Sequence, residues 1–265
     1  SYLNKFEIET SYGIKAWKRW GNTAEQIIKS NPYVLCIQGV DLSFSRADAV
    51  AAKSDIPADS ECRIKAGITY ILRQNADQGH TCLPLDSLVK TAVSYLDVDD
   101  KLIKKVIEDE TEEENLYYYD KHGRRFVMLA DFYKAEDYIA RRLAIMRQIS
   151  YDNKIDFSEV IDLEEENNGI QYEKIQREAI NLALSKGFLV LTGGPGTGKT
   201  TTLNAIISLY QQQGLNVMIC APTGRAAKRL SDLTGFDAKT IHRLLEVKHT
   251  SGDTLAFIHD ENNLL

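Results

Sequence analysis

Cysteines are few in this sequence of 265 residues, and long apolar runs are missing. The four cysteines, at positions 36, 62, 82 and 220, include no C-x-x-C pair, which predicts reduced thiols instead of zinc ligands or a disulfide framework. No apolar run reaches the roughly 18 residues of a membrane span, and no signal-peptide pattern opens the sequence. Solenoid repeats are also lacking. We therefore expect a cytoplasmic globular protein without membrane association.

Charge is distributed unevenly along the chain. The formal net charge is −6, which argues mildly against a passive nucleic-acid coat protein. Residues 171–265 carry ten Lys/Arg and eight Asp/Glu, whereas residues 1–170 carry twenty-two and thirty. A local basic strip can bind phosphates even in an acidic protein.

The spacing of apolar residues divides the chain into four segments. The sequence of residues 1–60 predicts short helices with breaks between them. The sequence of residues 61–150 predicts helices, then a β-hairpin and a long closing helix, and this order is that of a winged-helix module. Residues 151–170 are acidic with little periodicity, which is typical of a linker. Residues 171–265 alternate between helix and strand, with buried strands expected at 188–191 and 217–221, and thus predict the start of a parallel α/β sheet.

One motif in the last segment carries chemistry. Residues 193–200 read G-G-P-G-T-G-K-T and match G-x-x-x-x-G-K-[ST] at every fixed position. Such glycines let backbone N–H groups point at phosphate oxygens, and the following helix adds its positive end. Lys199 would contact the β- and γ-phosphates of ATP, and Thr200 would offer its hydroxyl to Mg²⁺. The alternative, a plain glycine-rich turn, does not explain the strand and helix predicted on either side.

The flanking sequences narrow the class of P-loop protein. Residues 171–180 read Q-Y-E-K-I-Q-R-E-A-I, residues 221–230 read A-P-T-G-R-A-A-K-R-L, and residues 240–245 read T-I-H-R-L-L. This ordered set resembles superfamily 1 DNA helicases, most closely the RecD branch (the α subunit of exodeoxyribonuclease V) and its longer stand-alone members. The resemblance implies a mainly helical N-terminal region, helix-hairpin-helix-like and then winged-helix-like, followed by an incomplete RecA-like P-loop domain.

The resemblance also implies roles for individual residues. Gln176 would hydrogen-bond adenine, although an exposed helix residue is its ordinary reading. The implied nucleotide-binding residues are Gln176, Gly194, Pro195, Gly196, Thr197, Gly198, Lys199, Thr200 and Thr201. Residues implied to contact single-stranded DNA are Pro222, Thr223, Gly224 and Arg225, expected as a loop after a strand, together with Thr240 and His242. Lys228 and Arg229 fit either a phosphate contact or a solvated helix face.

The N-terminal hairpin departs from the family pattern. A helix-hairpin-helix unit uses a G-x-G turn to approach phosphate, and we place that turn at Asp41-Leu42-Ser43. Asp41 puts a negative charge where a phosphate would sit. A structural or protein-contact role is therefore as consistent with this hairpin as DNA binding.

An apolar strand leading to Asp-Glu, which should follow the T-I-H element, is not found in these 265 residues. We therefore expect an inactive piece of a 5′–3′ helicase of repair or recombination that is completed by a second motor domain of the same polypeptide. Two alternatives remain. A conjugative relaxase helicase domain would need an upstream Tyr nucleophile and a His-rich metal site, and a regulatory module would bind nucleotide without translocating.

Overall fold

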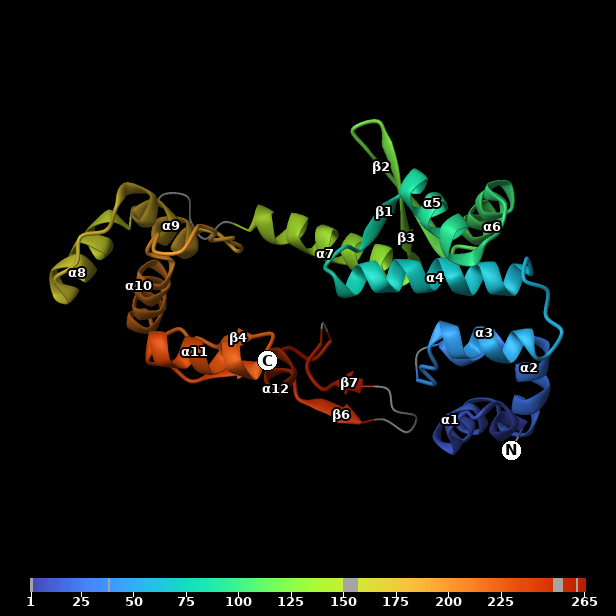
Figure 1. The fold of residues 1–265 in the computed structure, drawn as a ribbon. Coiled ribbons are helices and arrows are strands. Elements are labelled where there is room, and N and C mark those ends of the chain that lie inside the picture. Colours follow the sequence, from blue (N-terminus) through green and yellow to red (C-terminus); the bar gives the residue numbers. More distant parts are fainter. Residues whose placement is uncertain (1, 38, 150–156, 250–254, 261) are drawn as a thin grey trace. The chain divides into compact units, whose positions relative to one another are not determined.

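The computed structural model describes residues 2–37, 39–149, 157–249, 255–260 and 262–265 (Figure 1). The chain forms two compact units, one up to Tyr138 and the other from Ile139 to Thr250 with Leu255–Leu265. The division falls within helix α7 (Ala130–Gln148). None of the helices in the described ranges is long and apolar enough to cross a membrane.

The first unit begins with short helices. Asn31 accepts a hydrogen bond from the Tyr33 backbone N–H at 3.0 Å and so caps the turn that Pro32 opens. Helix α3 follows the turn and buries Phe44, Ala47 and Val50 on one face, as its apolar spacing predicts. The elements of this part are η1 (Tyr2–Phe6), α1 (Thr10–Trp20), η2 (Gly21–Thr23), α2 (Ala24–Ser30), η3 (Pro32–Cys36) and α3 (Phe44–Ala52).

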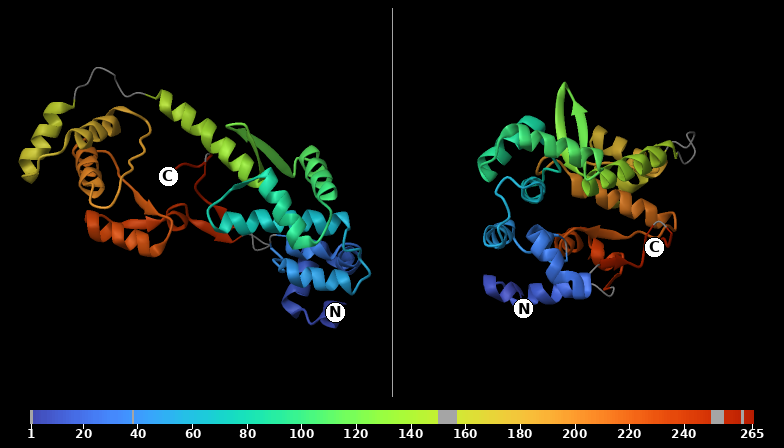
Figure 2. Two further views of the ribbon diagram at one scale, coloured as in Figure 1. Left: turned by 45° about the horizontal axis from the view of Figure 1, so that its top comes forward. Right: turned by 90° about the vertical axis from the view of Figure 1, so that its right-hand side faces the viewer.

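The rest of the first unit has the element order of a winged helix: α4 (Glu61–Asp77), β1 (Cys82–Pro84), α5 (Leu85–Leu96), α6 (Asp100–Glu112), β2 (Leu116–Lys121) and β3 (Arg124–Leu129). The three strands pair antiparallel in the order β1-β3-β2. His122 and Gly123 form the hairpin turn, both with positive φ, as two-residue hairpins require. The predicted hairpin is confirmed, and Figures 1 and 2 show it beside α5.

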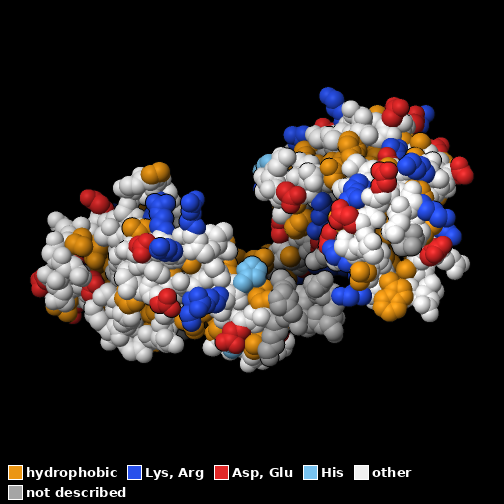
Figure 3. Space-filling view, turned by 60° about the horizontal axis from the view of Figure 1, so that its bottom comes forward, with side chains coloured by type: hydrophobic (Ala, Val, Ile, Leu, Met, Phe, Trp, Pro, Cys, Tyr) orange, Lys and Arg blue, Asp and Glu red, His pale blue; other side chains and the backbone are white. Residues whose placement is uncertain are grey.

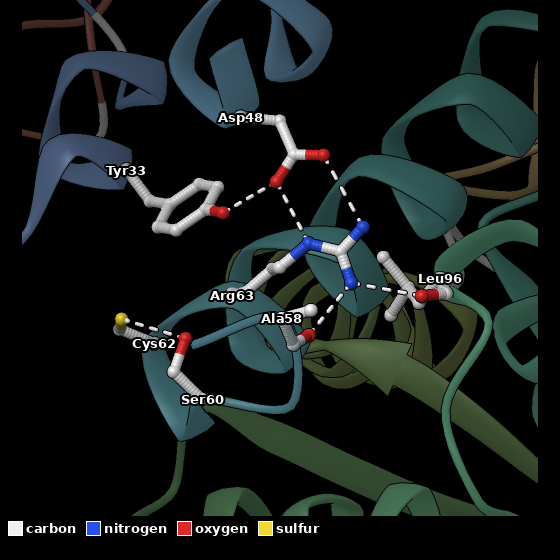
Figure 4. A network of polar contacts seen from close by, with 7 residues as sticks. All are labelled: Tyr33, Asp48, Ala58, Ser60, Cys62, Arg63 and Leu96. Carbon is white, nitrogen blue, oxygen red and sulfur yellow. Dashed lines mark hydrogen bonds and ion pairs between the residues drawn. The ribbon is translucent and has the colours of Figure 1, made fainter. Parts of the chain in front are cut away.

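One continuous core joins both parts of the first unit, because buried side chains from Leu3 to Leu129 belong to a single cluster. A polar network also connects them (Figure 4). The Arg63 guanidinium on α4 donates to Asp48 on α3 at 2.7 and 3.2 Å, and to the backbone oxygens of Ala58 and Leu96 at 2.7 and 2.8 Å. The Tyr33 hydroxyl donates to the same carboxylate at 2.5 Å.

This network shifts the pKa values of Asp48 and Tyr33. Burial by itself would raise the pKa of Asp48, but the hydrogen bonds from Arg63 and Tyr33, with the guanidinium charge, lower that pKa below its ordinary value. Burial, with the hydrogen bond to Asp48, raises the pKa of Tyr33 well above the usual range. Asp48 is therefore ionised, and Tyr33 protonated, at neutral pH.

The second unit contains a small parallel sheet flanked by helices. Strands β4 (Ile219–Ala221) and β5 (Ala238–Thr240) pair in parallel, and β6 (Val247–His249) pairs antiparallel with β7 (Leu255–Phe257). Its core includes Ile161, Ile180 and Leu209. The helices are α8 (Ser158–Asn168), α9 (Lys174–Ser185), α10 (Lys199–Gln212), α11 (Gly224–Thr234) and α12 (Ile241–Leu244). The expected fold class, a helical N-terminal region followed by a P-loop α/β part, is confirmed.

Two details of the second unit differ from expectation. Residues 188–191 form no strand, and Phe188 and Val190 are 39% and 66% exposed. A parallel strand needs hydrogen-bonded neighbours, and within the described ranges the parallel pairing is limited to β4 and β5. Helix α8 lies in the segment expected as a linker, where Ile161 gives it a buried anchor. Residues 151–156 of that segment lie outside the described ranges.

Candidate nucleotide and nucleic-acid sites

The P-loop curls directly into the first turn of α10. Gly198 is the residue before α10 and has φ +77°, a left-handed conformation that glycine adopts without strain. The Thr197 hydroxyl donates to the backbone oxygen of Gly194 at 2.9 Å. The Lys199 ammonium donates to the backbone oxygens of Gly193 and Gly194 at 2.7 and 2.5 Å. The lysine thus folds over the loop that is expected to hold the phosphates.

Gln176 on α9 lies against this loop, because a Cβ at residue 198 would overlap the Nε2 atom of Gln176. Gln176 also completes a capping box at the start of α9: its Oε1 accepts from the Glu173 backbone N–H at 2.9 Å, and the Glu173 side chain accepts from the Gln176 backbone. An amide oxygen has two acceptor lone pairs, so this oxygen retains capacity for an adenine amino group. The structure therefore brings Gln176 and the P-loop together, as the motif order predicts.

The remaining proposed nucleotide residues surround the same loop. Gly194, Pro195, Gly196 and Thr197 are exposed, whereas Gly198, Lys199, Thr200 and Thr201 are half-buried at the start of α10. A helix N-terminus presents unpaired N–H groups and a positive dipole end to an anion. A Thr200 hydroxyl there is an oxygen ligand of the kind that Mg²⁺ prefers. These residues fit a triphosphate with its metal.

The motifs proposed to bind DNA meet at one edge of the parallel sheet. Ala221 pairs with Thr240, so the carboxyl ends of β4 and β5 lie side by side. Pro222 and Thr223 follow β4, while Gly224 and Arg225, expected in a loop, are instead the first residues of α11. The Thr223 hydroxyl accepts from the Ala226 backbone N–H at 3.2 Å and so starts this helix early.

Thr240 and His242 lie at the same edge. The Thr240 hydroxyl caps α12 by accepting from the Arg243 backbone N–H at 3.2 Å. His242 is exposed, and its ring packs at a tilt against Phe257 with centroids 5.9 Å apart. Both residues therefore have a local structural role, and a DNA contact by either stays a prediction.

Three cations share one face of α11, because Arg225, Lys228 and Arg229 follow the i, i+3, i+4 spacing and all are exposed. Elsewhere, basic and acidic side chains are interspersed over the face that Figure 3 displays. On this face, a contact with phosphate would therefore depend on local groups of this kind.

In the N-terminal hairpin, the carboxylate of Asp41 is bound by groups of the hairpin's own unit. Both carboxylate oxygens of Asp41 accept from the Gly39 backbone N–H at 3.2 Å, and the Lys15 ammonium lies 3.8 Å from one of them. Gly39 and Asp41 have positive φ, whereas Leu42 is buried and Ser43 precedes α3. The Asp41 carboxylate thus occupies the Gly39 N–H beside the turn, while the N–H groups of Asp41 and Leu42 donate to the backbone oxygens of Ile37 and Leu35.

Sequence reasoning missed the ion pairs that Arg177 forms beside Gln176. Arg177, next to Gln176, binds carboxylates on α8, the helix that was not expected. The Glu-x-x-Gln spacing of Glu173 and Gln176 is a readable capping signal. The partners of Arg177 carry no comparable local signal.

These elements define the class: a P-loop nucleotide-binding domain that follows a helical region with a hairpin and a winged-helix order. Comparison with known proteins agrees. Residues 1–82 match the family model of the ATP-dependent RecD2 DNA helicase HHH domain, and residues 176–265 match that of the AAA domain. The resemblance to RecD-like helicases is confirmed.

Individual relatives cover different shares of the chain. The ATP-dependent RecD2 DNA helicase of Deinococcus radiodurans is 28% identical over 87% of this chain and 33% of its own length. The RecBCD enzyme subunit RecD of Mycolicibacterium smegmatis is 42% identical over 26% of this chain and 17% of its own. DNA-binding protein SMUBP-2 of Mus musculus is 43% identical over 26% of this chain and 7% of its own length. The chain thus spans about a third of the first relative and less of the others.

Proposed function

We propose that this chain is the ATP-binding part of a RecD-like, 5′–3′ DNA helicase that acts in repair or recombination in the cytoplasm. ATP with Mg²⁺ would bind at the P-loop, and single-stranded DNA would pass the edge where β4 and β5 end. The observation that carries the proposal is the contact between Gln176 and Gly198, which joins an adenine-reading amide to a phosphate-binding loop.

Each residue of the site has a role in this proposal. Lys199 would leave the oxygens of Gly193 and Gly194 and move its ammonium to the β- and γ-phosphates. Thr200 would hold Mg²⁺, which neutralises charge on those phosphates when bound. Gln176 would select adenine, while the backbone N–H groups of residue 194 and of residues 196–201 would surround the phosphate oxygens.

The proposed path of single-stranded DNA runs past the edge of the sheet where β4 and β5 end. Arg225 at the start of α11 supplies a cation beside the backbone of Thr223 and Gly224, whose helix end favours anions. Lys228 and Arg229 continue the same face. These contacts read the phosphate backbone and predict binding without sequence preference.

A helicase motor closes two RecA-like domains around ATP, and these 265 residues lack an apolar strand that leads to Asp-Glu. We therefore propose that the chain by itself binds ATP without turning it over, and that a second motor domain of the same polypeptide completes the site. DNA-stimulated phosphate release from the 265-residue chain would contradict this part of the proposal.

Nucleotide binding is tested by titrating the chain with a fluorescent ATP analogue and Mg²⁺, with Lys199→Ala as the comparison. Removal of a charge-assisted phosphate contact should weaken binding by about tenfold or more. Lys186→Ala serves as the control, since it removes a lysine from the same unit outside the P-loop. Equal affinity of wild type and Lys199→Ala would show that Lys199 does not bind phosphate.

A further inference from the structure

Helix α8 contacts both helices that form the nucleotide site. Its Ile161 is buried in the core of the second unit, where Ile180 on α9 and Leu209 on α10 also lie. Its next turn carries Glu164 and Glu165, and Asp162 lies one residue after Ile161. Carboxylates at these positions therefore sit between the start of α9 and the end of α10.

Arg177 joins α9 to α8 through two ion pairs. Its Nη1 donates to Glu165 at 2.7 Å, and its Nη2 binds Asp162. The other oxygen of Glu165 accepts from the Tyr172 backbone N–H at 2.7 Å, just before α9 begins. Glu165 thus fixes two points around Glu173, the residue that shares the capping box with Gln176.

Glu164 joins α8 to α10. The residue is only 3% exposed, so its carboxylate needs partners inside the protein. One oxygen accepts from the Gln212 amide on α10 at 2.7 Å, and the other accepts from Asn168 at 2.8 Å. Because α10 begins at the P-loop, Glu164 fixes α8 relative to the phosphate-binding helix.

Gln176 needs such support. It approaches Gly198 from a different helix, and its amide must present a donor and an acceptor at set positions to read adenine. A binding group is precise when neighbouring contacts restrict its motion. Arg177 is the adjacent residue, so movement of its backbone would move Gln176 as well.

We propose that α8 is a positioning element for adenine recognition: Arg177, held by Glu165 and Asp162, places Gln176, and Glu164 sets that assembly against the P-loop helix. The inference rests on the proposed nucleotide site and deepens it by assigning nucleotide specificity to residues that do not touch the nucleotide. It concerns the preference for ATP over GTP, since both share the phosphates that Lys199 would bind.

The test measures the affinities of ATP and GTP for wild type, Arg177→Ala, Arg177→Lys and Glu165→Gln. Arg177→Ala should lower ATP affinity by about tenfold with little change for GTP, because lost positioning affects only the base contact. Arg177→Lys, which keeps the charge, should restore most of the preference. The matched control is Lys174→Ala, which removes an exposed cation from the same helix.

The outcomes separate the two proposals. A wild-type chain that binds neither nucleotide overturns the proposed function itself. A wild type that prefers ATP, with the same preference in Arg177→Ala and Glu165→Gln, overturns the positioning role, even if both variants melt at lower temperature. Equal binding of ATP and GTP by wild type overturns it as well. If Arg177→Ala does not fold, Glu165→Gln decides the matter, because its amide oxygen still accepts from Tyr172.

Discussion

Gln176 and Gly198 touch across two helices, so closely that residue 198 has no room for a Cβ. The contact explains why a glycine stands immediately before Lys199: its φ of +77° suits glycine, and its missing side chain admits the Gln176 amide. Gln176 and the glycine-rich loop are therefore built as one local structure, which is the arrangement that the proposed ATP site requires.

Gly198→Ala is expected to weaken ATP binding on the order of tenfold. The left-handed conformation costs a residue with Cβ roughly 1–2 kcal/mol, and the new methyl group would also displace Gln176. Titration with ATP and with GTP measures both effects. Gly224→Ala is the control, since nothing lies within 4 Å of its Cβ position. Unchanged ATP affinity in Gly198→Ala would contradict the proposed site.

The proposed DNA path predicts that Arg225→Ala in the full-length protein weakens single-stranded DNA binding uniformly across sequences. One lost phosphate contact lowers the dependence of log affinity on log salt by about one unit. Fluorescence anisotropy with an unstructured oligonucleotide at several salt concentrations measures this slope. A slope identical to that of wild type would remove Arg225 from the DNA path.

Asp41→Gly should leave DNA binding unchanged or tighten it. The substitution frees the Gly39 N–H, removes a negative charge, and places glycine where φ is +62°. The same anisotropy series measures the effect. Clear weakening would mean that the Asp41 carboxylate itself supports the DNA-bound state.

Arg63→Ala should destabilise the first unit by roughly 2 kcal/mol, because Asp48 and two backbone oxygens would lose their donor. Both tryptophans, Trp17 and Trp20, lie in this unit, so urea unfolding followed by tryptophan fluorescence reports it. Lys104→Ala breaks an exposed pair with Asp100 and should change the free energy of unfolding by less than about 0.5 kcal/mol. Equal effects of the two substitutions would count against the network.

Asp48→Asn should alter how stability depends on pH. The folded-state pKa of Asp48 is lower than its ordinary value of 3.8, so its contribution is complete above that value and lost as pH falls through the folded pKa. The difference in unfolding free energy between wild type and Asp48→Asn should be constant above about pH 5 and shrink below about pH 4. Urea unfolding at several pH values measures it, and a constant difference would assign the acid dependence to other carboxylates.

The sequence by itself determined the P-loop, the order of motifs and most helices, because these depend on residues that are close along the chain. Helical spacing in α3 and the His122-Gly123 turn are local properties. The resemblance to RecD-like helicases likewise follows from short runs that the sequence displays in order.

The tertiary structure determined the features that depend on contacts between residues far apart in the sequence. Residues 188–191 are apolar enough for a strand, but a strand forms only where neighbours satisfy its backbone. Helix α8 has little periodicity, and its role becomes visible only when Glu164 meets Gln212 and Glu165 meets Arg177. Likewise, the pairing of Ala221 with Thr240 brings two motifs to one edge. Ion pairs and strand pairs leave no signal in the local sequence, because the fold determines which distant residues come into contact.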